Sequence, residues 1–269
     1  MSRQVPVVRY RSTDCHQEVD LVADEAPLQI DVNGESLTLT MRTPGDDEPL
    51  ALGLLYCEGI ISHTADVAEF SMEYISKAGQ APDLLKIVLS SQAPLTRSGW
   101  ERRFPSTSSC GVCGKTDPDS LQCLAVPIAQ STFTMSASAI YALPTEMRSA
   151  QRAFNSTGGL HAAALFNKSG ALIRVYEDIG RHNAVDKIIG SELLNGVTDF
   201  SDRILLISGR ASFEIVQKAA VAGIPILCAV SAPSSLAVRL AHDMNLTLVG
   251  FLRDETMNIY TGTGRITAR

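Results

Sequence analysis

The fold of this chain is decided by the stretch Ile204-Leu205-Leu206-Ile207-Ser208-Gly209-Arg210-Ala211-Ser212, in which four apolar residues end abruptly in small and polar ones. Two more apolar runs follow, over residues 224–230 and 246–252, and segments with helical spacing separate the three runs, over 212–222 and 235–244. Uninterrupted apolar runs that alternate with amphipathic helices are typical of parallel strands buried on both faces. We therefore expect an α/β fold with a mainly parallel sheet.

The residues before these runs continue the pattern. Apolar residues at helical spacing predict a helix over 181–194. A longer helix over 136–154 is expected to kink at Pro144, because proline cannot donate a backbone hydrogen bond. Two strands are expected over 161–166 and 171–177, joined by a short polar turn.

The first hundred residues favour strands. Apolar and polar residues alternate from Leu28 to Met41 around Asn33-Gly34, the usual two-residue turn of a hairpin. An acidic start, an early proline and a terminal glycine predict a helix over 47–59, and a further strand is expected over 83–89.

This change of pattern indicates two domains. Residues 94–105 have the composition of a linker, and glycine, serine and proline dominate the segment after it. We predict a smaller, strand-rich α+β domain over 1–105, a mobile loop over 106–118 and an α/β domain over 119–269.

Composition narrows the classes of function. The 269 residues are 45% hydrophobic and carry a formal net charge of −6, which indicates a soluble globular protein and argues against nucleic acid as the main partner. The start of the chain has no apolar signal-peptide core, and no apolar stretch is long enough to span a bilayer. We expect a cytoplasmic protein that does not bind membranes, in which the six cysteines are free thiols.

The segment Ser108-Ser109-Cys110-Gly111-Val112-Cys113-Gly114-Lys115 points to sulfur chemistry. Glycines after both cysteines leave the backbone mobile, and the lysine favours the nucleophilic thiolate. A lone Cys-x-x-Cys also occurs as half of a zinc site or as a disulfide oxidoreductase pair. A zinc site ranks below thiol chemistry here, because no second Cys-x-x-Cys and no His-x-x-x-His completes a set of four ligands.

Polar residues gather where predicted strands end and helices begin, as in 177–183, 208–212 and 231–235. Such junctions line the ligand crevice of an open α/β sheet, and the free amides of helix starts favour anions. We expect a phosphate-bearing ligand there. Positive charge is available from Arg181, His182, Lys187, Arg210 and Lys218, and Arg181 and Arg210 are the preferred contacts.

Together these segments resemble the formate dehydrogenase accessory sulfurtransferase family, FdhD/NarQ. The matching blocks are spread over nearly the whole chain, which makes them more specific than any single motif. They are Thr43-Pro44-Gly45-Asp46-Asp47-Glu48, Cys110-Gly111-Val112-Cys113-Gly114-Lys115, Thr157-Gly158-Gly159-Leu160-His161, Gly180-Arg181-His182-Asn183-Ala184-Val185-Asp186-Lys187, Ser208-Gly209-Arg210-Ala211-Ser212-Phe213-Glu214 and Ser231-Ala232-Pro233-Ser234-Ser235-Leu236-Ala237.

The resemblance implies a sulfur carrier that accepts sulfane sulfur from a cysteine desulfurase and passes it to a molybdenum cofactor destined for formate dehydrogenase. It implies the persulfide on Cys110 with Cys113 as its partner, a homodimer, and a cytidine-deaminase-like C-terminal fold whose mixed sheet has helices on both faces. Cys113 either expels the terminal sulfur from the Cys110 persulfide or only tunes its thiol, and the sequence does not choose between these roles.

The cofactor implied by the resemblance is a bis(molybdopterin guanine dinucleotide) molybdenum centre, held as bound acceptor, and no structural metal is expected. The family's binding stretch falls on Phe251 to Thr256, where Phe251 either stacks on a purine or packs in the core. The predicted cofactor-binding residues are Phe251, Leu252, Arg253, Asp254, Glu255, Thr256, Arg181, His182, Ser208, Gly209, Arg210, Ser231 and His161.

Two alternative functions require other residues than this one. A zinc deaminase would carry His-x-Glu before Pro-Cys-x-x-Cys, whereas His161 follows the cysteines here and Ala163 occupies the position of the glutamate. A chaperone that binds the cofactor or the apoenzyme without covalent chemistry would not need Cys110.

Overall fold

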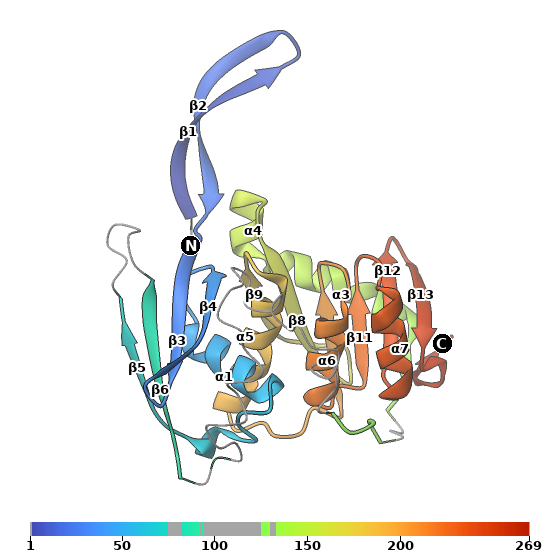
Figure 1. Ribbon diagram of the computed structural model, residues 1–269. Coiled ribbons are helices and arrows are strands. Elements are labelled where there is room, and N and C mark those ends of the chain that lie inside the picture. Colours follow the sequence, from blue (N-terminus) through green and yellow to red (C-terminus); the bar gives the residue numbers. More distant parts are fainter. Residues whose placement is uncertain (1, 75–81, 92, 94–124, 130–132, 269) are drawn as a thin grey trace.

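The computed structural model describes residues 2–74, 82–91, 93, 125–129 and 133–268. Its largest element is a six-stranded sheet with the order β13-β12-β11-β10-β8-β9 (Figure 1). The strands are β8 (His161–Asn167), β9 (Leu172–Asp178), β10 (Arg203–Ile207), β11 (Ile226–Ala229), β12 (Thr247–Arg253) and β13 (Thr256–Thr261).

The sheet is mixed, which confirms the mixed sheet that the family resemblance implied, whereas the mainly parallel sheet expected from the apolar runs alone was wrong. Strands β10, β11 and β12 are parallel, as their apolar runs predicted. Strands β8, β9 and β13 pair antiparallel with their neighbours. The reason lies in the connections, because the short turns after β8 and β12 can only join antiparallel strands.

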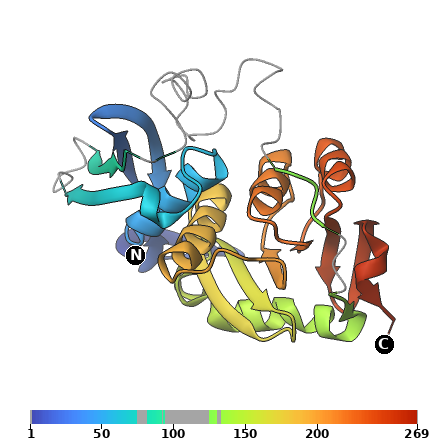
Figure 2. The ribbon, with the colours of Figure 1, turned by 90° about the horizontal axis from the view of Figure 1, so that it is seen from below.

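Helices cover both faces of this sheet (Figure 2). On one face lie α5 (Arg181–Leu194), α6 (Phe213–Val221) and α7 (Ser235–Asp243), and on the other lies α3 (Ala137–Ala150). In β10, Leu205 belongs to the core under α5 to α7, and Leu206 to the core under α3. Burial on both faces explains why the strand runs are uninterrupted by polar residues.

The helix expected over 136–154 is two helices, so the prediction of one helix was wrong. Helix α3 continues through Pro144 to Ala150, the chain turns at Gln151, and α4 runs over Arg152–Thr157. The Glu177 carboxylate, on β9, accepts hydrogen bonds from the backbone N–H groups of Ala153 and Phe154 at 2.9 and 2.6 Å. This distant carboxylate satisfies the donors at the start of α4, which favours a new helix there.

The N-terminal part contains a four-stranded sheet in the order β4-β3-β6-β5. The predicted hairpin is confirmed, with positive φ at both Asn33 and Gly34 of its turn. The elements are β3 (Ala26–Val32), β4 (Glu35–Arg42), α1 (Asp47–Cys57), the 3₁₀ turn η1 (Thr64–Asp66), β5 (Val67–Glu73) and β6 (Asp83–Leu89).

A separate pair of short parallel strands connects β7 (Met135–Ser136), which precedes α3, with β14 (Ile266–Thr267) near the end of the chain. The 3₁₀ turn η3 (Thr263–Arg265) comes directly before β14.

Helix α1 packs directly on α5 and joins the N-terminal sheet to the six-stranded sheet through one apolar core. The crossing is close because a glycine of each helix faces the other: a Cβ added to Gly190 would lie 1.9 Å from the Pro49 carbonyl oxygen. The predicted domain boundaries near residues 105 and 118 lie outside the described residues and stay a prediction.

Strands β1 (Ser2–Arg11) and β2 (Asp14–Ala23) form a separate two-stranded antiparallel hairpin that projects from the body of the molecule (Figure 1). Its base lies against α4. No helix in the described part of the chain is long and apolar enough to cross a membrane.

Candidate functional site

The predicted site residues lie along one edge of the six-stranded sheet. The edge contains the carboxyl ends of β9, β10, β11 and β12 and the start of β8, where His161 pairs with Asp178. Ser208, just after β10, exchanges hydrogen bonds of 2.9 Å with the Ala162 backbone, and the Phe251 N–H donates to the Ser231 carbonyl. The junctions that the sequence placed apart are therefore neighbours, as expected for strands whose carboxyl ends share an edge.

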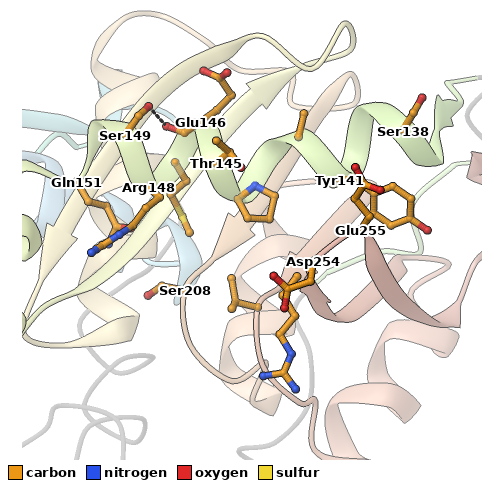
Figure 3. A pocket seen from close by; sticks show the side chains of 15 residues that line it. Ser138, Tyr141, Thr145, Glu146, Arg148, Ser149, Gln151, Ser208, Asp254 and Glu255 are labelled. Atoms are coloured by element: carbon orange, nitrogen blue, oxygen red, sulfur yellow. Dashed lines mark hydrogen bonds between the residues drawn. The ribbon is translucent and has the colours of Figure 1, made fainter.

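The sheet divides these residues into two groups. One group, on the side of α5 and α6, contains His161, Arg181 and His182. The other group lines a cavity of about 870 Å³ on the side of α3, and contains four predicted residues: Ser208, Arg253, Asp254 and Glu255 (Figure 3). Four further predicted residues lie at the same edge without lining the cavity: Gly209 and Arg210 follow Ser208, Ser231 follows β11, and Thr256 begins β13 and donates a hydrogen bond to the Arg253 carbonyl.

The α5 and α6 side is rich in positive charge. Arg181, half-buried, forms no ion pair with the described residues, and His182 Nε2 lies 3.4 Å from Ser212 Oγ at the start of α6. Burial, together with the nearby Lys218 and Arg181 charges, lowers the pKa of His182 to about 4. Burial and Arg181 also lower the pKa of His161. Both imidazoles are therefore neutral at pH 7, and the region favours anions over further cations.

We expect His182 to titrate near pH 4 in the folded protein. Because an unfolded histidine binds its proton near pH 6.5, the stability that His182 contributes is complete above that pH and is lost as the pH falls toward 4. Replacing Arg181 with glutamine removes a neighbouring positive charge and is expected to raise the midpoint. Histidine NMR, with His182→Gln to assign the signal, measures both midpoints; a His182 midpoint near 6.5 in the unmodified chain would contradict the buried, cationic environment.

The two lysines suggested as anion contacts are unavailable, which corrects that interpretation. Lys218 Nζ lies 2.6 Å from the Asp186 carboxylate, and both groups are buried. Although burial opposes the charge of Lys218, Asp186 raises the pKa of this lysine, so it stays protonated. Lys187 is likewise buried, with Nζ 2.8 Å from Asp178. Asp186 therefore pairs across to α6 rather than within its own helix.

Asp178 organises the turn that presents Arg181 and His182. One carboxylate oxygen accepts from the Gly180 N–H and the Asn183 side chain, at 2.8 and 2.9 Å. The other accepts from Lys187 and from the Thr43 N–H. Thr43 Oγ1 accepts from the Ile179 N–H at 3.0 Å. The loop after β4 thereby fixes the start of α5.

Replacing the buried Thr43 with valine is expected to lower the free energy of unfolding by about 1–2 kcal/mol, because the part-buried Ile179 N–H loses its acceptor while the side-chain shape is kept. Thr43→Ser keeps the hydroxyl and serves as the matched control, with a smaller loss. Urea denaturation of the three proteins measures the difference. Equal stability of the valine and serine variants would show that the hydroxyl is not the group that matters.

The cavity on the α3 side contains two arginines in defined positions. The Arg148 guanidinium lies 4.3 Å from the centre of the Phe154 ring, and that of Arg253 lies 5.9 Å from the Phe251 ring. Neither arginine forms an ion pair with another described residue. Aromatic contact orients a guanidinium and leaves its N–H groups free to bind an anion in the plane of the fork.

The backbone next to the cavity is strained. Phe251, Asp254 and Glu255 all have positive φ, between 50° and 56°, although none is glycine. Phe251 lies in a bulge between β12 and β13, and Asp254 and Glu255 form the two-residue turn between these strands. Strained backbone of this kind is concentrated at binding sites. The Leu252 side chain is fully buried in the core under α3, which leaves only its backbone for a ligand.

Sequence reasoning missed the contribution of α3 to this cavity. One polar face of the helix lines it, from Ser138 and Tyr141 through Thr145 to Arg148 (Figure 3). The spacing of three and four residues was visible in the sequence. However, a polar helical face is also typical of solvent exposure, and only the position of the helix over the sheet edge distinguishes the two.

The described cysteines are Cys15, which is exposed, and Cys57 and Cys228, which are buried. Burial raises the pKa of both buried thiols, that of Cys228 to about 12, so they are not nucleophiles at neutral pH. Cys110, Cys113 and their loop lie outside the described residues. Within the described ranges, no three His, Cys, Asp or Glu side chains gather in a way that would hold a metal.

The fold and the site define a class of protein: a mixed α/β protein with an arginine-lined cavity at the carboxyl ends of its parallel strands, beside a strained backbone segment. The profile of the FdhD/NarQ family matches residues 23–267, and the chain belongs to this family. This confirms the resemblance found in the sequence. The match leaves out only the projecting hairpin and the last two residues.

Relatives from distant organisms share nearly the whole chain. The sulfur carrier protein FdhD of Streptomyces coelicolor is 46% identical over 98% of this chain and 95% of its own length. That of Sulfolobus acidocaldarius is 44% identical over 98% of both chains. The crystal structure of a candidate formate dehydrogenase accessory protein from Desulfotalea psychrophila is 25% identical, with a TM-score of 0.76 over 99% of both chains. This similarity supports the mixed α/β fold; the cytidine-deaminase-like relationship stays a prediction.

Proposed function

We propose that this protein is a sulfur carrier for the maturation of formate dehydrogenase, with Cys110 as the carrier residue. The observation that supports this most strongly is the similarity to proteins named as sulfur carriers, which extends over nearly the whole chain. The Cys-x-x-Cys segment supplies the chemistry that such a role requires.

In the proposed reaction, the Cys110 thiolate attacks the outer sulfur of a persulfide on a cysteine desulfurase. The bond between the two donor sulfurs breaks, the desulfurase cysteine leaves as a thiolate, and Cys110 becomes a persulfide. The outer sulfur then passes to the molybdenum cofactor, which is the substrate of the second step. Cys113 either attacks the inner sulfur, which releases the outer sulfur as sulfide and leaves a Cys110–Cys113 disulfide, or only tunes the first thiol.

We propose that the cavity under α3 holds the guanine dinucleotide part of that cofactor. A volume of about 870 Å³ is within the range of nucleotide-sized sites, and Arg148 and Arg253 provide charge for phosphate. The neutral histidines and Arg181 would extend the anion-favouring edge beyond the cavity. In this arrangement the loop brings its sulfur to a cofactor held by the rigid edge of the sheet.

The experiment that tests the carrier step is an intact mass measurement. The purified protein is incubated with a cysteine desulfurase and cysteine, with and without a thiol reductant, and the loop peptide is then mapped. A gain of sulfur that the reductant removes and that maps to Cys110 is expected. If neither loop cysteine gains sulfur from a competent desulfurase, the carrier mechanism is wrong.

A non-covalent cofactor chaperone is the second candidate function. The cavity supports it, because Arg148 and Arg253 could bind the phosphates of the nucleotide part without any covalent step. A chaperone would bind the nucleotide part through the same residues and would keep its effect on formate dehydrogenase when the cysteines are replaced.

Replacing Arg253 with alanine is expected to raise the Kd for a guanine nucleotide about tenfold or more, because one charge-assisted contact to phosphate is lost. Arg239→Ala, at an exposed position on α7 away from the cavity, serves as the control and should leave the Kd unchanged. Calorimetry with GDP measures both. Equal weakening by the two variants would show that general surface charge, rather than the cavity, binds the nucleotide.

A further inference from the structure

The cavity under α3 carries negative as well as positive charge. Its lining includes three carboxylates, those of Glu146, Asp254 and Glu255, besides the two arginines. Carboxylates repel phosphate, so an acidic side chain in a nucleotide cavity needs a partner other than the phosphates. The exposed Glu255 forms no ion pair within the described part of the chain, which leaves its carboxylate available to a ligand.

The two kinds of charge lie at different ends of the cavity. In Figure 3, Arg148 and Ser208 lie toward one end, Tyr141 and Glu255 lie toward the other, and Asp254 lies between them. Tyr141 precedes Arg148 by seven residues on α3, which separates the two by about 10 Å along the helix axis. The cavity therefore has a cationic end beside Ser208 and an aromatic, acidic end at the turn between β12 and β13.

Tyr141 provides the aromatic surface at the acidic end. Among the described residues that line the cavity it is the only aromatic one, and Phe251 is not among them. Tyr141 is half-buried and packs against the core under α3, which holds its ring in place. A fixed aromatic ring is a suitable platform for a nucleotide base.

We propose that Tyr141 and Glu255 select the base of the bound nucleotide, with Tyr141 stacking on its face and Glu255 accepting hydrogen bonds from its edge. Guanine presents two neighbouring donors, a ring N–H and an amino group, which match the two oxygens of a carboxylate. Adenine and cytosine present a ring nitrogen acceptor in place of the N–H, and this acceptor faces the carboxylate unfavourably. The pair thus admits guanine and rejects adenine and cytosine. This inference rests on the proposed nucleotide binding and adds the residues that determine the base.

The backbone at Glu255 agrees with a role in binding. Its φ is 56°, a left-handed conformation that glycine adopts readily and glutamate does not. A carboxylate at such a position lowers stability relative to glycine, so it contributes something other than stability. The fixed turn also sets the direction in which the side chain leaves the backbone.

The test is calorimetry with GDP, IDP and ADP, because IDP differs from GDP only by the missing amino group. The unmodified chain is expected to bind GDP about tenfold more tightly than IDP, and ADP more weakly than IDP. Glu255→Gln is expected to weaken GDP binding about tenfold and to reduce the preference for GDP over IDP to less than about threefold. Glu69→Gln, at an exposed position on β5 outside the cavity, is the matched control and should leave every Kd unchanged.

Tyr141→Ala separates stacking from recognition of the edge. It is expected to weaken GDP and IDP by the same factor, about tenfold, because stacking does not distinguish the two bases. A GDP-to-IDP ratio that falls in this variant as far as in Glu255→Gln would contradict the separate role of Tyr141. Circular dichroism checks that all variants stay folded.

Two outcomes would overturn the proposal and leave nucleotide binding intact. The first is an unmodified chain that binds GDP, IDP and ADP equally well, and the second is a Glu255→Gln variant that keeps the full preference for GDP over IDP. A ratio of two Kd values reports recognition of the amino group, which a general loss of structure does not change selectively. An unmodified chain that binds no GDP would overturn the cavity proposal as well, whereas sulfur loading on Cys110 is measured separately by mass.

Discussion

Gly190→Ala is expected to destabilise the protein by at least about 3 kcal/mol. The added Cβ would lie 1.9 Å from the Pro49 carbonyl oxygen and 2.6 Å from the Gly53 nitrogen. Both are backbone atoms, so no side-chain rotation relieves the overlap, and α1 must move away from α5. The helix propensity that alanine gains over glycine, about 1 kcal/mol, is too small to compensate.

The crossing of α1 and α5 makes this effect large, because it lies within the core that joins the two sheets. Gly53→Ala is expected to act similarly, since its Cβ would lie 2.0 Å from the Asp186 carbonyl oxygen. Gly264→Ala serves as the control, with no atom within 4 Å of the new Cβ. Urea denaturation of the three variants measures the difference. A Gly190→Ala variant as stable as Gly264→Ala would mean that the helices are not in backbone contact.

If the proposed carrier role holds, Cys110→Ser is expected to abolish sulfur transfer to the molybdenum cofactor of formate dehydrogenase. A serine hydroxyl cannot attack a persulfide at neutral pH and cannot carry a sulfane sulfur, so the variant loses the carrier step itself rather than its efficiency. Intact mass after incubation with desulfurase and cysteine should show no bound sulfur on the loop. Reconstituted formate dehydrogenase should remain inactive.

Cys15→Ser is the matched control for this prediction, because Cys15 is an exposed free thiol without a surrounding motif. It should retain full sulfur transfer. Cys113→Ser separates the two roles left open for the second cysteine: loss of delivery with retained loading indicates that Cys113 releases the sulfur. Full activation of formate dehydrogenase by Cys110→Ser would instead favour the non-covalent chaperone.

The site combines rigid and strained parts. Asp178 and Thr43 connect the loop after β4 to the start of α5, so the N-terminal part contributes to the position of Arg181 and His182. The strained segment at Phe251 and the face of α3 form the cavity on the other side of the sheet. Ligand contacts at this edge therefore depend on packing from both ends of the chain.

The sequence by itself determined many of the local elements, and the proposed sulfur chemistry is based on its Cys-x-x-Cys motif. Apolar runs predicted β10, β11 and β12, and the turn at Asn33-Gly34 predicted the β3–β4 hairpin, because these signals depend on neighbouring residues along the chain. The family was also recognisable from ordered motifs. The same sequence reasoning expected one helix over 136–154 and free lysines at positions 187 and 218, and both expectations were wrong.

Only the tertiary structure decided which polar residues remain available to a ligand and which form ion pairs inside the protein. Lys187 and Lys218 carry the same charge in the sequence as Arg181 and Arg253, but burial beside Asp178 and Asp186 pairs the lysines and leaves the arginines available. The break after α3 depends on Glu177, more than twenty residues away. Partners that distant along the chain are set by how the sheet and helices pack, and that packing produces no local pattern in the sequence.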